Sequence, residues 1–279
     1  MEVCSLIDEN EIYTSFKKII KPSDSTIVLY SGVWSFINKI NFKKDIGKKL
    51  LDIIEKVVTP DRTLILPSFS SNSFLKNFKF DLKNSLDNNN GIIPKEAIKR
   101  KYYYRTPQPL HSYLIFGKKI HEIKKLELKT SWGKTSILEW ISKSNSRICV
   151  LGIPWNKGCS YLHRFEEKFN VPWRYYKKFS GKIYNNKKYV GYCEENKFSS
   201  PSKIIFKYDY KPLVKLMEKN KIFLNGNSKF FLQSTKAKHI DKIANNFFKT
   251  NSGWQIVKNK SETRNWINKF KNSEIENND

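Results

Sequence analysis

The stretch STIVLYSG at residues 25–32 decides the fold together with RTLILPSFS at residues 62–70. Each is a short apolar run that stops at Ser, Gly or Pro, which is typical of a buried strand. Between them, residues 38–58 (NKINFKKDIGKKLLDIIEKVV) place apolar side chains at helical spacing. A strand, a helix and a second strand in this order predict a βαβ unit in a parallel sheet.

Further segments extend this unit along the chain. HSYLIFG (111–117) and SRICVLGIPW (146–155) predict two more central strands. Residues 135–144 between them predict a short helix that begins after Thr135 or Ser136. We expect an α/β fold with a mainly parallel central sheet between two helical layers.

Three other segments complete the expected architecture. Residues 8–20 and 234–250 have the spacing of amphipathic helices, and the alternation over residues 182–192 predicts an added antiparallel hairpin. The chain has no repeat and no Gly/Ser-rich linker. We therefore expect one three-layer α/β/α domain over residues 1–270 and a polar tail over residues 271–279.

Composition limits the class of protein. With 39% hydrophobic and 14% aromatic residues, the 279-residue chain can bury a core. It has neither an 18-residue apolar run nor a basic-then-apolar leader, so we expect a cytoplasmic protein without a membrane span. Cys4, Cys149, Cys159 and Cys193 lack metal-ligand or disulfide spacing, so we expect neither a zinc site nor a disulfide framework.

The net charge of +26 favours anionic ligands. The lysines are spread along the chain without forming one stripe, which indicates a general compositional bias more than a nucleic-acid surface. Such a field favours phosphorylated ligands over polycations.

Polar residues follow three of the expected strands, at residues 31–35, 67–73 and 156–163. Ligands of open α/β sheets bind at the carboxyl ends of the strands. None of these segments is a dinucleotide or Walker loop, so NAD and ATP are not indicated. Their hydroxyls and backbone amides suit a phosphate or an extended polar chain.

The segment CSYLHRFEE (159–167) carries the strongest catalytic pattern. His163 lies three and four residues before Glu166 and Glu167. An imidazole titrates near neutral pH and can accept a proton, and a carboxylate one helical turn away can hold its tautomer. Helical spacing does not choose between the two glutamates, and a histidine with no catalytic role remains the alternative.

Five blocks of the sequence, in order, resemble the aminoglycoside 3-N-acetyltransferase family. They are LYSGVWSF (29–36), TLILPSFS (63–70), GIIPKEAIKRKYYYRTPQPLHSYLIFG (91–117), GKTS (133–136) and VLGIPWNKGCSYLHRFEE (150–167). The last block resembles the family's Thr-x-x-His-x-x-Glu. Ser160, His163 and Glu166 are in register with it.

The resemblance implies direct transfer of an acetyl group from acetyl-CoA to an amine, without a metal. It implies His163 as the general base and Glu166 as its partner, in preference to Glu167. It also makes Cys159 an improbable nucleophile. The residues it implies for acetyl-CoA binding are Ser31, Gly32, Val33, Ser35, Ser68, Ser70, Arg105 and Ser112.

Several positions depart from the family's usual residues. Tyr30 stands for a His, Gly32 and Trp34 for Ser, Thr106 and Gln108 for Ser and His, and Ile137 for Pro. These departures affect the loops expected at the acetyl donor.

The charge and the resemblance together suggest an acceptor. A strongly basic chain is poorly suited to polycationic aminoglycosides, so we expect acetylation of an amino sugar, nucleotide-linked or destined for a surface polysaccharide. Aminoglycoside acetylation that confers antibiotic resistance is the alternative. A non-catalytic nucleic-acid-binding protein is a second alternative, and the oligomeric state is left open, with a dimer as one option.

Overall fold

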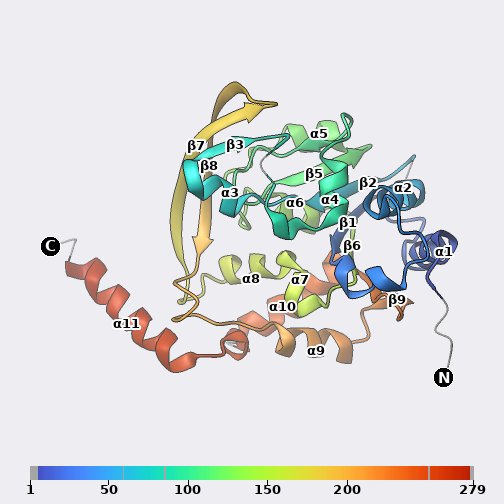
Figure 1. Ribbon diagram of the computed structural model, residues 1–279. Helices are drawn as coiled ribbons and strands as arrows, with labels where there is room; N and C mark the ends of the chain where they lie inside the picture. The colour runs from blue at the N-terminus through green and yellow to red at the C-terminus, as the bar shows by residue number, and fades with distance from the viewer. Residues whose placement is uncertain (1–5, 59, 85, 251, 277–279) are drawn as a thin grey trace.

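A computed structural model describes residues 6–58, 60–84, 86–250 and 252–276. It consists of a large sheet between helices and a smaller sheet built around a long hairpin (Figure 1). The strands of the large sheet lie in the order β4-β5-β2-β1-β6-β10-β9. Their bounds are β1 (Thr26–Ser31), β2 (Thr63–Pro67), β4 (Tyr104–Arg105), β5 (Tyr113–Gly117), β6 (Ser146–Leu151), β9 (Leu224–Asn227) and β10 (Leu232–Lys236).

The centre of the large sheet is parallel. Strand β1 pairs in parallel with both β2 and β6, so Thr26 lies opposite Thr63 on one side and Ser146 on the other. Strands β5 and β10 pair antiparallel with β2 and β6, and β4 and β9 add antiparallel edges. The carboxyl ends of β2, β1 and β6 therefore meet at one edge, where a ligand site is expected.

Most helices pack on the two faces of this sheet, while α3 (Ser71–Asn77) packs against the small sheet and α11 (Lys260–Glu276) extends away from the rest of the chain (Figure 1). The other helices are α1 (Glu9–Ile19), α2 (Ile46–Val58), α4 (Ile92–Ala97), α5 (Ile120–Lys124), α6 (Ile137–Lys143), α7 (Trp155–Gly158), α8 (His163–Lys168), α9 (Lys211–Lys219) and α10 (Ala237–Lys249). Short 3₁₀ turns occupy Val33–Ser35, Ile37–Lys39, Asn88–Asn90, Ser160–Leu162 and Ser252–Ile256.

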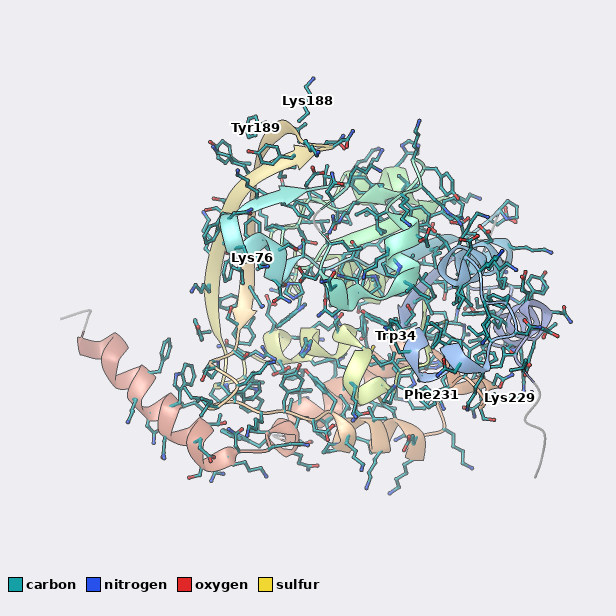
Figure 2. The ribbon with its side chains drawn as sticks, in the orientation of Figure 1. Trp34, Lys76, Lys188, Tyr189, Lys229 and Phe231 are labelled. Carbon is teal, nitrogen blue, oxygen red and sulfur yellow. The ribbon has the colours of Figure 1, made fainter. Side chains whose placement is uncertain are left out.

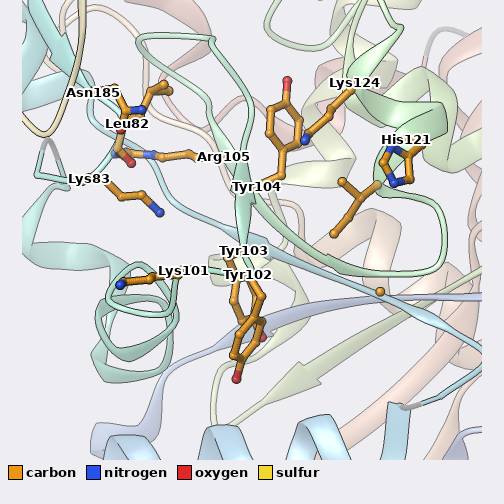
Figure 3. Close-up of a pocket in the computed structure, with 12 residues that line it drawn as sticks. Leu82, Lys83, Lys101, Tyr102, Tyr103, Tyr104, Arg105, His121, Lys124 and Asn185 are labelled. Carbon is orange, nitrogen blue, oxygen red and sulfur yellow. Dashed lines mark hydrogen bonds between the residues drawn. The ribbon is translucent and has the colours of Figure 1, made fainter. Parts of the chain in front are cut away.

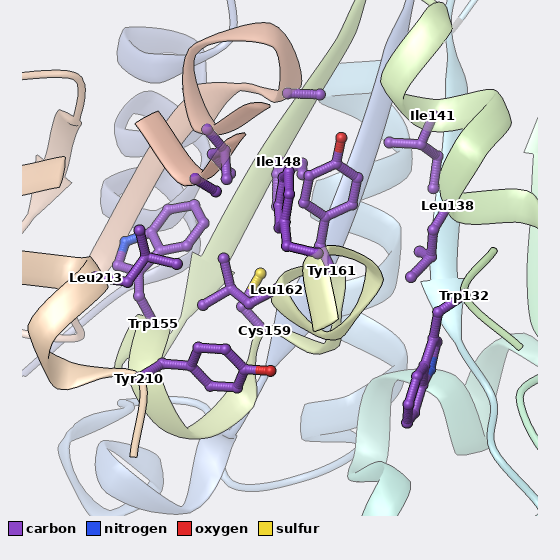
Figure 4. Packing of buried hydrophobic residues seen from close by; sticks show 14 of the residues in the cluster. Trp132, Leu138, Ile141, Ile148, Trp155, Cys159, Tyr161, Leu162, Tyr210 and Leu213 are labelled. Carbon is purple, nitrogen blue, oxygen red and sulfur yellow. The ribbon is translucent and has the colours of Figure 1, made fainter. Parts of the chain in front are cut away.

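Alternate residues of each central strand enter different cores. Ile27 and Leu29 of β1 pack with α1, α2 and α4, whereas Val28 and Tyr30 pack with α6, α8, α9 and α10. This period of two is expected for a strand that is buried on both faces. Figure 4 shows part of the second core, where Ile148 of β6 lies near Tyr161 and Leu162.

The small sheet contains β3 (Lys79–Asp81), β7 (Tyr175–Asn185) and β8 (Lys188–Ser199). Strands β7 and β8 form the long curved hairpin that stands beside the large sheet (Figure 1). Its inner face brings Glu195 toward the interior, where this carboxylate is fully buried. The hairpin thus contributes polar residues to the region at the carboxyl ends of the parallel strands.

The expected α/β class, the parallel βαβ unit and the added hairpin are confirmed. The antiparallel strands outside the parallel centre make the sheet mixed. Helix α6 begins after Ser136, whose hydroxyl accepts a hydrogen bond from the Glu139 backbone. The segment expected as a polar tail belongs to α11 as far as Glu276, and residues 277–279 lie outside the described residues, as does Cys4.

Within the described residues, no helix has the length and apolarity needed to cross a membrane. The cysteines Cys149, Cys159 and Cys193 are free and buried.

The turn after β5 depends on a glycine. Gly117 has φ +106°, and a Cβ placed there would lie 2.2 Å from the Arg62 carbonyl oxygen. Gly191 has φ +143° but no atom within 4 Å of a built Cβ. We expect Gly191→Ala to cost about 1–3 kcal/mol through backbone strain. Gly117→Ala should cost more, because it adds a backbone collision. Urea denaturation measures both, and equal losses would contradict the role assigned to the Arg62 carbonyl.

Candidate active site

The loop after β6 places His163 at the carboxyl edge of the parallel strands. Gly152 ends β6 in a left-handed conformation, with φ +67°. Helix α7 and a 3₁₀ turn follow, and α8 begins at His163. The hydroxyl of Ser160 donates to the hydroxyl of Tyr30, 3.2 Å away, which ties this loop to the end of β1.

One nitrogen of the His163 ring, Nδ1, has two close polar neighbours, and Arg174 Nη2 lies farther from it at 3.4 Å. Nδ1 lies 2.9 Å from Glu166 Oε1 and 2.8 Å from the hydroxyl oxygen of Tyr210. The Tyr210 hydroxyl in turn donates to Glu166 Oε1. An ionised Glu166 can only accept hydrogen bonds, so the arrangement favours a proton on Nδ1. Nε2 then carries the lone pair that can accept a proton.

Glu166 is completely buried and bonded on both oxygens. Arg174 Nε lies 2.7 Å from Oε2, and Arg174 Nη2 lies 3.0 Å from Oε1. The indole of Trp173 donates to Oε2 at 2.9 Å. Burial disfavours the charged carboxylate, but Arg174 and His163 outweigh that effect and hold the Glu166 pKa well below its usual range. Glu166 is therefore an anion near neutral pH.

Aromatic rings enclose the His163 imidazole. Trp132 stacks on it with ring centres 4.8 Å apart, while Tyr208 and Tyr210 approach edge-on. Burial lowers the His163 pKa, although Glu166 acts in the opposite direction. The imidazole is therefore neutral at pH 7 and able to accept a proton.

A second buried imidazole lies on the other side of Trp132. The His111 ring centre is 5.3 Å from that of Trp132, and its Nδ1 lies 3.1 Å from Glu195 Oε1 and 3.0 Å from Ser131 Oγ. Ser131 Oγ also donates to Glu195 Oε1 at 2.6 Å. This network joins the hairpin to the loop that contains Trp132, and so supports the wall against which His163 stacks.

Most partners of His163 were not found from the sequence. Arg174, Tyr210 and Trp132 come from other elements, and no spacing in the chain links them to His163. The indole of Trp173 also donates to the Glu166 carboxylate, and no sequence pattern predicts this contact. Of the two glutamates, Glu166 is the one in contact with His163 Nδ1.

The end of β1 is the accessible part of the site expected for acetyl-CoA. Ser31 and Gly32 are half-buried, Ser35 is exposed, and Val33 is buried. Gly32 brings β1 close to the loop after β6, since a Cβ there would lie 3.2 Å from Ile153 Cβ. Beside them, Trp34 is 75% exposed on the surface turn (Figure 2).

Four other residues expected at acetyl-CoA are buried in an internal network. Ser112 Oγ donates to the Ser68 carbonyl at 2.6 Å, and Ser68 Oγ donates to Ser112 Oγ at 3.3 Å. Ser70 Oγ donates to the Pro109 carbonyl at 2.6 Å. Arg105 Nη2 and Nε donate to the Ser68 carbonyl and Ser112 Oγ. These contacts fasten two loops together, and acetyl-CoA binding by these four residues stays a prediction.

Arg105 also lines a separate cavity of about 360 Å³ at the β4 edge. Figure 3 shows Lys83, Lys101 and Lys124 around it, together with Tyr104. Burial lowers the Arg105 pKa to about 9.

Cys159 does not have the features of a nucleophile. Its side chain is 5% exposed and packs in the apolar core, and burial raises its pKa to about 12. The thiol is therefore protonated at neutral pH. In the part of the chain that the structure describes, no three His, Cys, Asp or Glu side chains are grouped as a metal site requires.

Comparison with known families gives one match. The sequence profile of the family described as aminoglycoside 3-N-acetyltransferase matches residues 33–228. Among curated proteins, none matches the chain.

Several solved structures share the fold. The YokD protein from Bacillus subtilis has a TM-score of 0.67 at 14% identity, over 86% of this chain and 98% of its own. The aminoglycoside acetyltransferase AAC(3)-Xa has a TM-score of 0.70 at 14% identity, over 87% of this chain and 92% of its own. AAC-IIIb in a binary complex with CoASH has a TM-score of 0.69 at 13% identity, over 88% and 98%.

The buried ion pair of Glu166 and Arg174 predicts an effect on the free energy of unfolding, which can be measured without an activity assay. Glu166→Gln should destabilise the fold by about 3–5 kcal/mol at pH 7, because Arg174 keeps its buried charge without a counter-charge. The wild-type stabilisation is complete above the unfolded pKa of 4.5 and is lost as pH falls below it. Urea denaturation between pH 7 and pH 3 measures both effects.

The matched control is the double variant Glu166→Gln/Arg174→Met, which removes both charges. It should be more stable than Glu166→Gln alone. A double variant that loses the sum of the two single losses would show that the ion pair carries no coupling energy.

Proposed function

The chain belongs to the aminoglycoside 3-N-acetyltransferase family, and on that premise we propose that it acetylates an amino group of an aminoglycoside-type amino sugar, with His163 as general base. It is an acetyl-CoA-dependent N-acetyltransferase, and acetyl-CoA supplies the reactive thioester. One observation supports the role of His163 above others. Its Nδ1 is held by an ionised, buried Glu166, which leaves Nε2 as the basic nitrogen.

The reaction requires the removal of one proton from the acceptor nitrogen. The amine lone pair attacks the thioester carbonyl carbon, and His163 Nε2 takes a proton from that nitrogen. Glu166 stabilises the resulting imidazolium through Nδ1–H. When the C–S bond breaks, the proton on Nε2 passes to the departing sulfur, which restores the neutral ring and gives a free thiol and an amide.

The position of the donor is proposed from the fold. The backbone of residues 31–35 lies at the carboxyl edge of the parallel strands, with Ser31 and Gly32 partly accessible. The solved neighbour AAC-IIIb is a complex with CoASH, which supports a CoA site in this fold. We place the thioester between this loop and His163, and the reaction in the cytoplasm.

The acceptor differs from the one favoured by the sequence. The charge of +26 pointed to a nucleotide-linked amino sugar, but the family and its solved neighbours favour the aminoglycoside alternative. One neighbour, AAC(3)-IVa, is described in complex with a gentamicin, and AAC-VIa is described as bound to sisomicin. The charge that an acceptor meets is local. Glu166 contacts His163, and Glu167 contacts the backbone of Trp132, whose ring stacks on His163.

Replacing the base should abolish most turnover. His163→Ala is expected to reduce kcat by about 10²–10⁴-fold. Calorimetric affinity for acetyl-CoA should change little, because the lost group acts on the acceptor. The wild-type kcat/KM should stay high below pH 6.5, since burial lowers the pKa of the neutral imidazole that acts as base.

The matched control is His239→Ala, in the first turn of α10, which should keep wild-type turnover and the same pH profile. An unchanged rate in His163→Ala would remove this residue from the base role.

The acceptor class is tested by comparing the kcat/KM values of two kinds of acceptor. We expect acetyl transfer to gentamicin or sisomicin with a kcat/KM at least roughly tenfold above that for a nucleotide-linked amino sugar, as one lost charged hydrogen bond would give. Thiol release from acetyl-CoA, followed by mass spectrometry of the product, measures both. Faster acetylation of the nucleotide-linked sugar would overturn the aminoglycoside proposal.

A further inference from the structure

Another cavity, with a volume of about 610 Å³, lies at the edge of the large sheet opposite the candidate active site. Its lining includes Arg147 near the start of β6 and Lys236 at the end of β10, which are paired across these two strands. His163 follows the other end of β6. At about 3.3 Å per residue, this strand separates the two edges by roughly 17 Å. The cavity therefore does not belong to the site of acetyl transfer.

One buried carboxylate neutralises only part of the positive charge beside this cavity. Asp24 is 1% exposed and Arg147 is 4% exposed, and the Arg147 Nε donates to Asp24. Lys236 Nζ lies 2.5 Å from the same carboxylate. Burial disfavours the charged form of Asp24, but Arg147 and Lys236 outweigh that effect and hold the Asp24 pKa below its usual range. Two cations thus share one anion.

Three further lysines line the cavity without a counter-charge. Lys221 precedes β9, and Lys238 and Lys242 lie on α10. All three are exposed, and none of them forms an ion pair with the residues that the structure describes. Asp241, the acid of α10, receives its hydrogen bond from Arg164 instead. The cavity therefore has a positive charge that the described part of the chain does not compensate.

Two of these lysines repel each other in the folded protein. Lys238 and Lys242 are four residues apart on α10, which places them on one face of the helix. Like charges at this spacing destabilise a helix, and the first turn of α10 has no acidic residue to offset them. A group of charges that lowers the stability of the fold is typical of a functional site.

The lining of the cavity also contains apolar side chains. Ile222 and Leu224 are half-buried, and Ile243 is 8% exposed. Pockets of this volume hold organic ligands. The five cations come from β6, β10, α10 and the segment before β9, so a ligand with several linked anionic groups can contact more of them than a single phosphate can.

We propose that this cavity binds a polyphosphate group, either as a free polyphosphate ion or as the phosphate chain of a nucleotide. Arg147 and Lys236 form the rigid part of the site, and Lys221, Lys238 and Lys242 contact the ligand from its rim. Phosphate oxygens accept several hydrogen bonds and carry the negative charge that these side chains need. The inference goes beyond the proposed acetyl transfer and does not depend on it.

The test measures binding of tripolyphosphate and of ATP by calorimetry, without acetyl-CoA and without magnesium. We expect both anions to bind the wild type, with an affinity that falls as the salt concentration rises. The triple variant Lys221→Gln/Lys238→Gln/Lys242→Gln should bind about tenfold more weakly or worse, because each exposed ion pair contributes up to roughly fivefold. Absence of binding to the wild type, or unchanged affinity in the triple variant, would overturn the site.

The matched control removes the same charge from other parts of the surface. Lys44→Gln/Lys76→Gln/Lys188→Gln changes three exposed lysines that do not line the cavity. This variant should keep the wild-type affinity for both anions. Equal losses in the two triple variants would assign the binding to the net charge of +26 and refute a local site.

Thermal unfolding gives a second readout, because the lysines of the cavity repel one another. Without an anion, the cavity variant should melt at the same temperature as the wild type or at a higher one. Tripolyphosphate should raise the melting temperature of the wild type and of the control variant more than that of the cavity variant. A cavity variant that melts below the wild type would show that these lysines have partners within the fold, which contradicts the proposal.

The two anions also distinguish the sources of the polyphosphate group. Equal affinities for tripolyphosphate and ATP support recognition of the phosphate chain alone. Tighter binding of ATP supports a nucleotide whose nucleoside part contacts Ile222 and Leu224. A single-stranded oligonucleotide that binds more tightly than either anion, with the same affinity for both triple variants, would identify a general nucleic-acid surface and overturn the cavity as the site.

Discussion

Glu166 and Arg174 are both withdrawn from water, and each charge is tolerable because the other lies within hydrogen-bonding distance. This ion pair also positions other parts of the structure. Glu166 sets the orientation and tautomer of His163, and Arg174 joins the start of the hairpin to helix α8. The Arg174 guanidinium also lies 5.0 Å from the centre of the Trp132 ring, which stacks on His163. One ion pair thereby connects the imidazole, its wall and the inserted sheet.

The sequence predicts the centre of the fold better than its edges. Strands β1, β2 and β6 are buried on both faces, so they appear as continuous apolar runs, and the connecting helix makes their parallel direction predictable. Strands β4 and β9 are short and lie at the sheet edges, with little apolar pattern. The direction of β5 and β10 depends on tertiary packing, because an apolar run has the same composition in either direction.

The same limit applies to the site. His163 and Glu166 are three residues apart, so one helical turn brings their side chains together. Their contact can therefore be predicted from the sequence. Arg174 and Tyr210 reach the same point from a strand end and a distant loop, and only the folded chain shows them as neighbours. Ser68 and Ser112 illustrate a second limit. A hydroxyl at a strand end has the same sequence pattern whether or not it also donates to a carbonyl of the adjoining loop, as Ser112 does.

Net charge is a property of the whole surface, whereas recognition depends on the groups that face a ligand. Exposed lysines on opposite sides of the molecule are screened from one another beyond about 10 Å at ordinary ionic strength. A buried carboxylate is screened far less. Within the described residues, Glu166 and Glu195 have internal partners, and Glu167 has an oxygen without a donor. The net charge of +26 therefore does not decide which acceptor the protein takes, because the groups that face His163 set that choice.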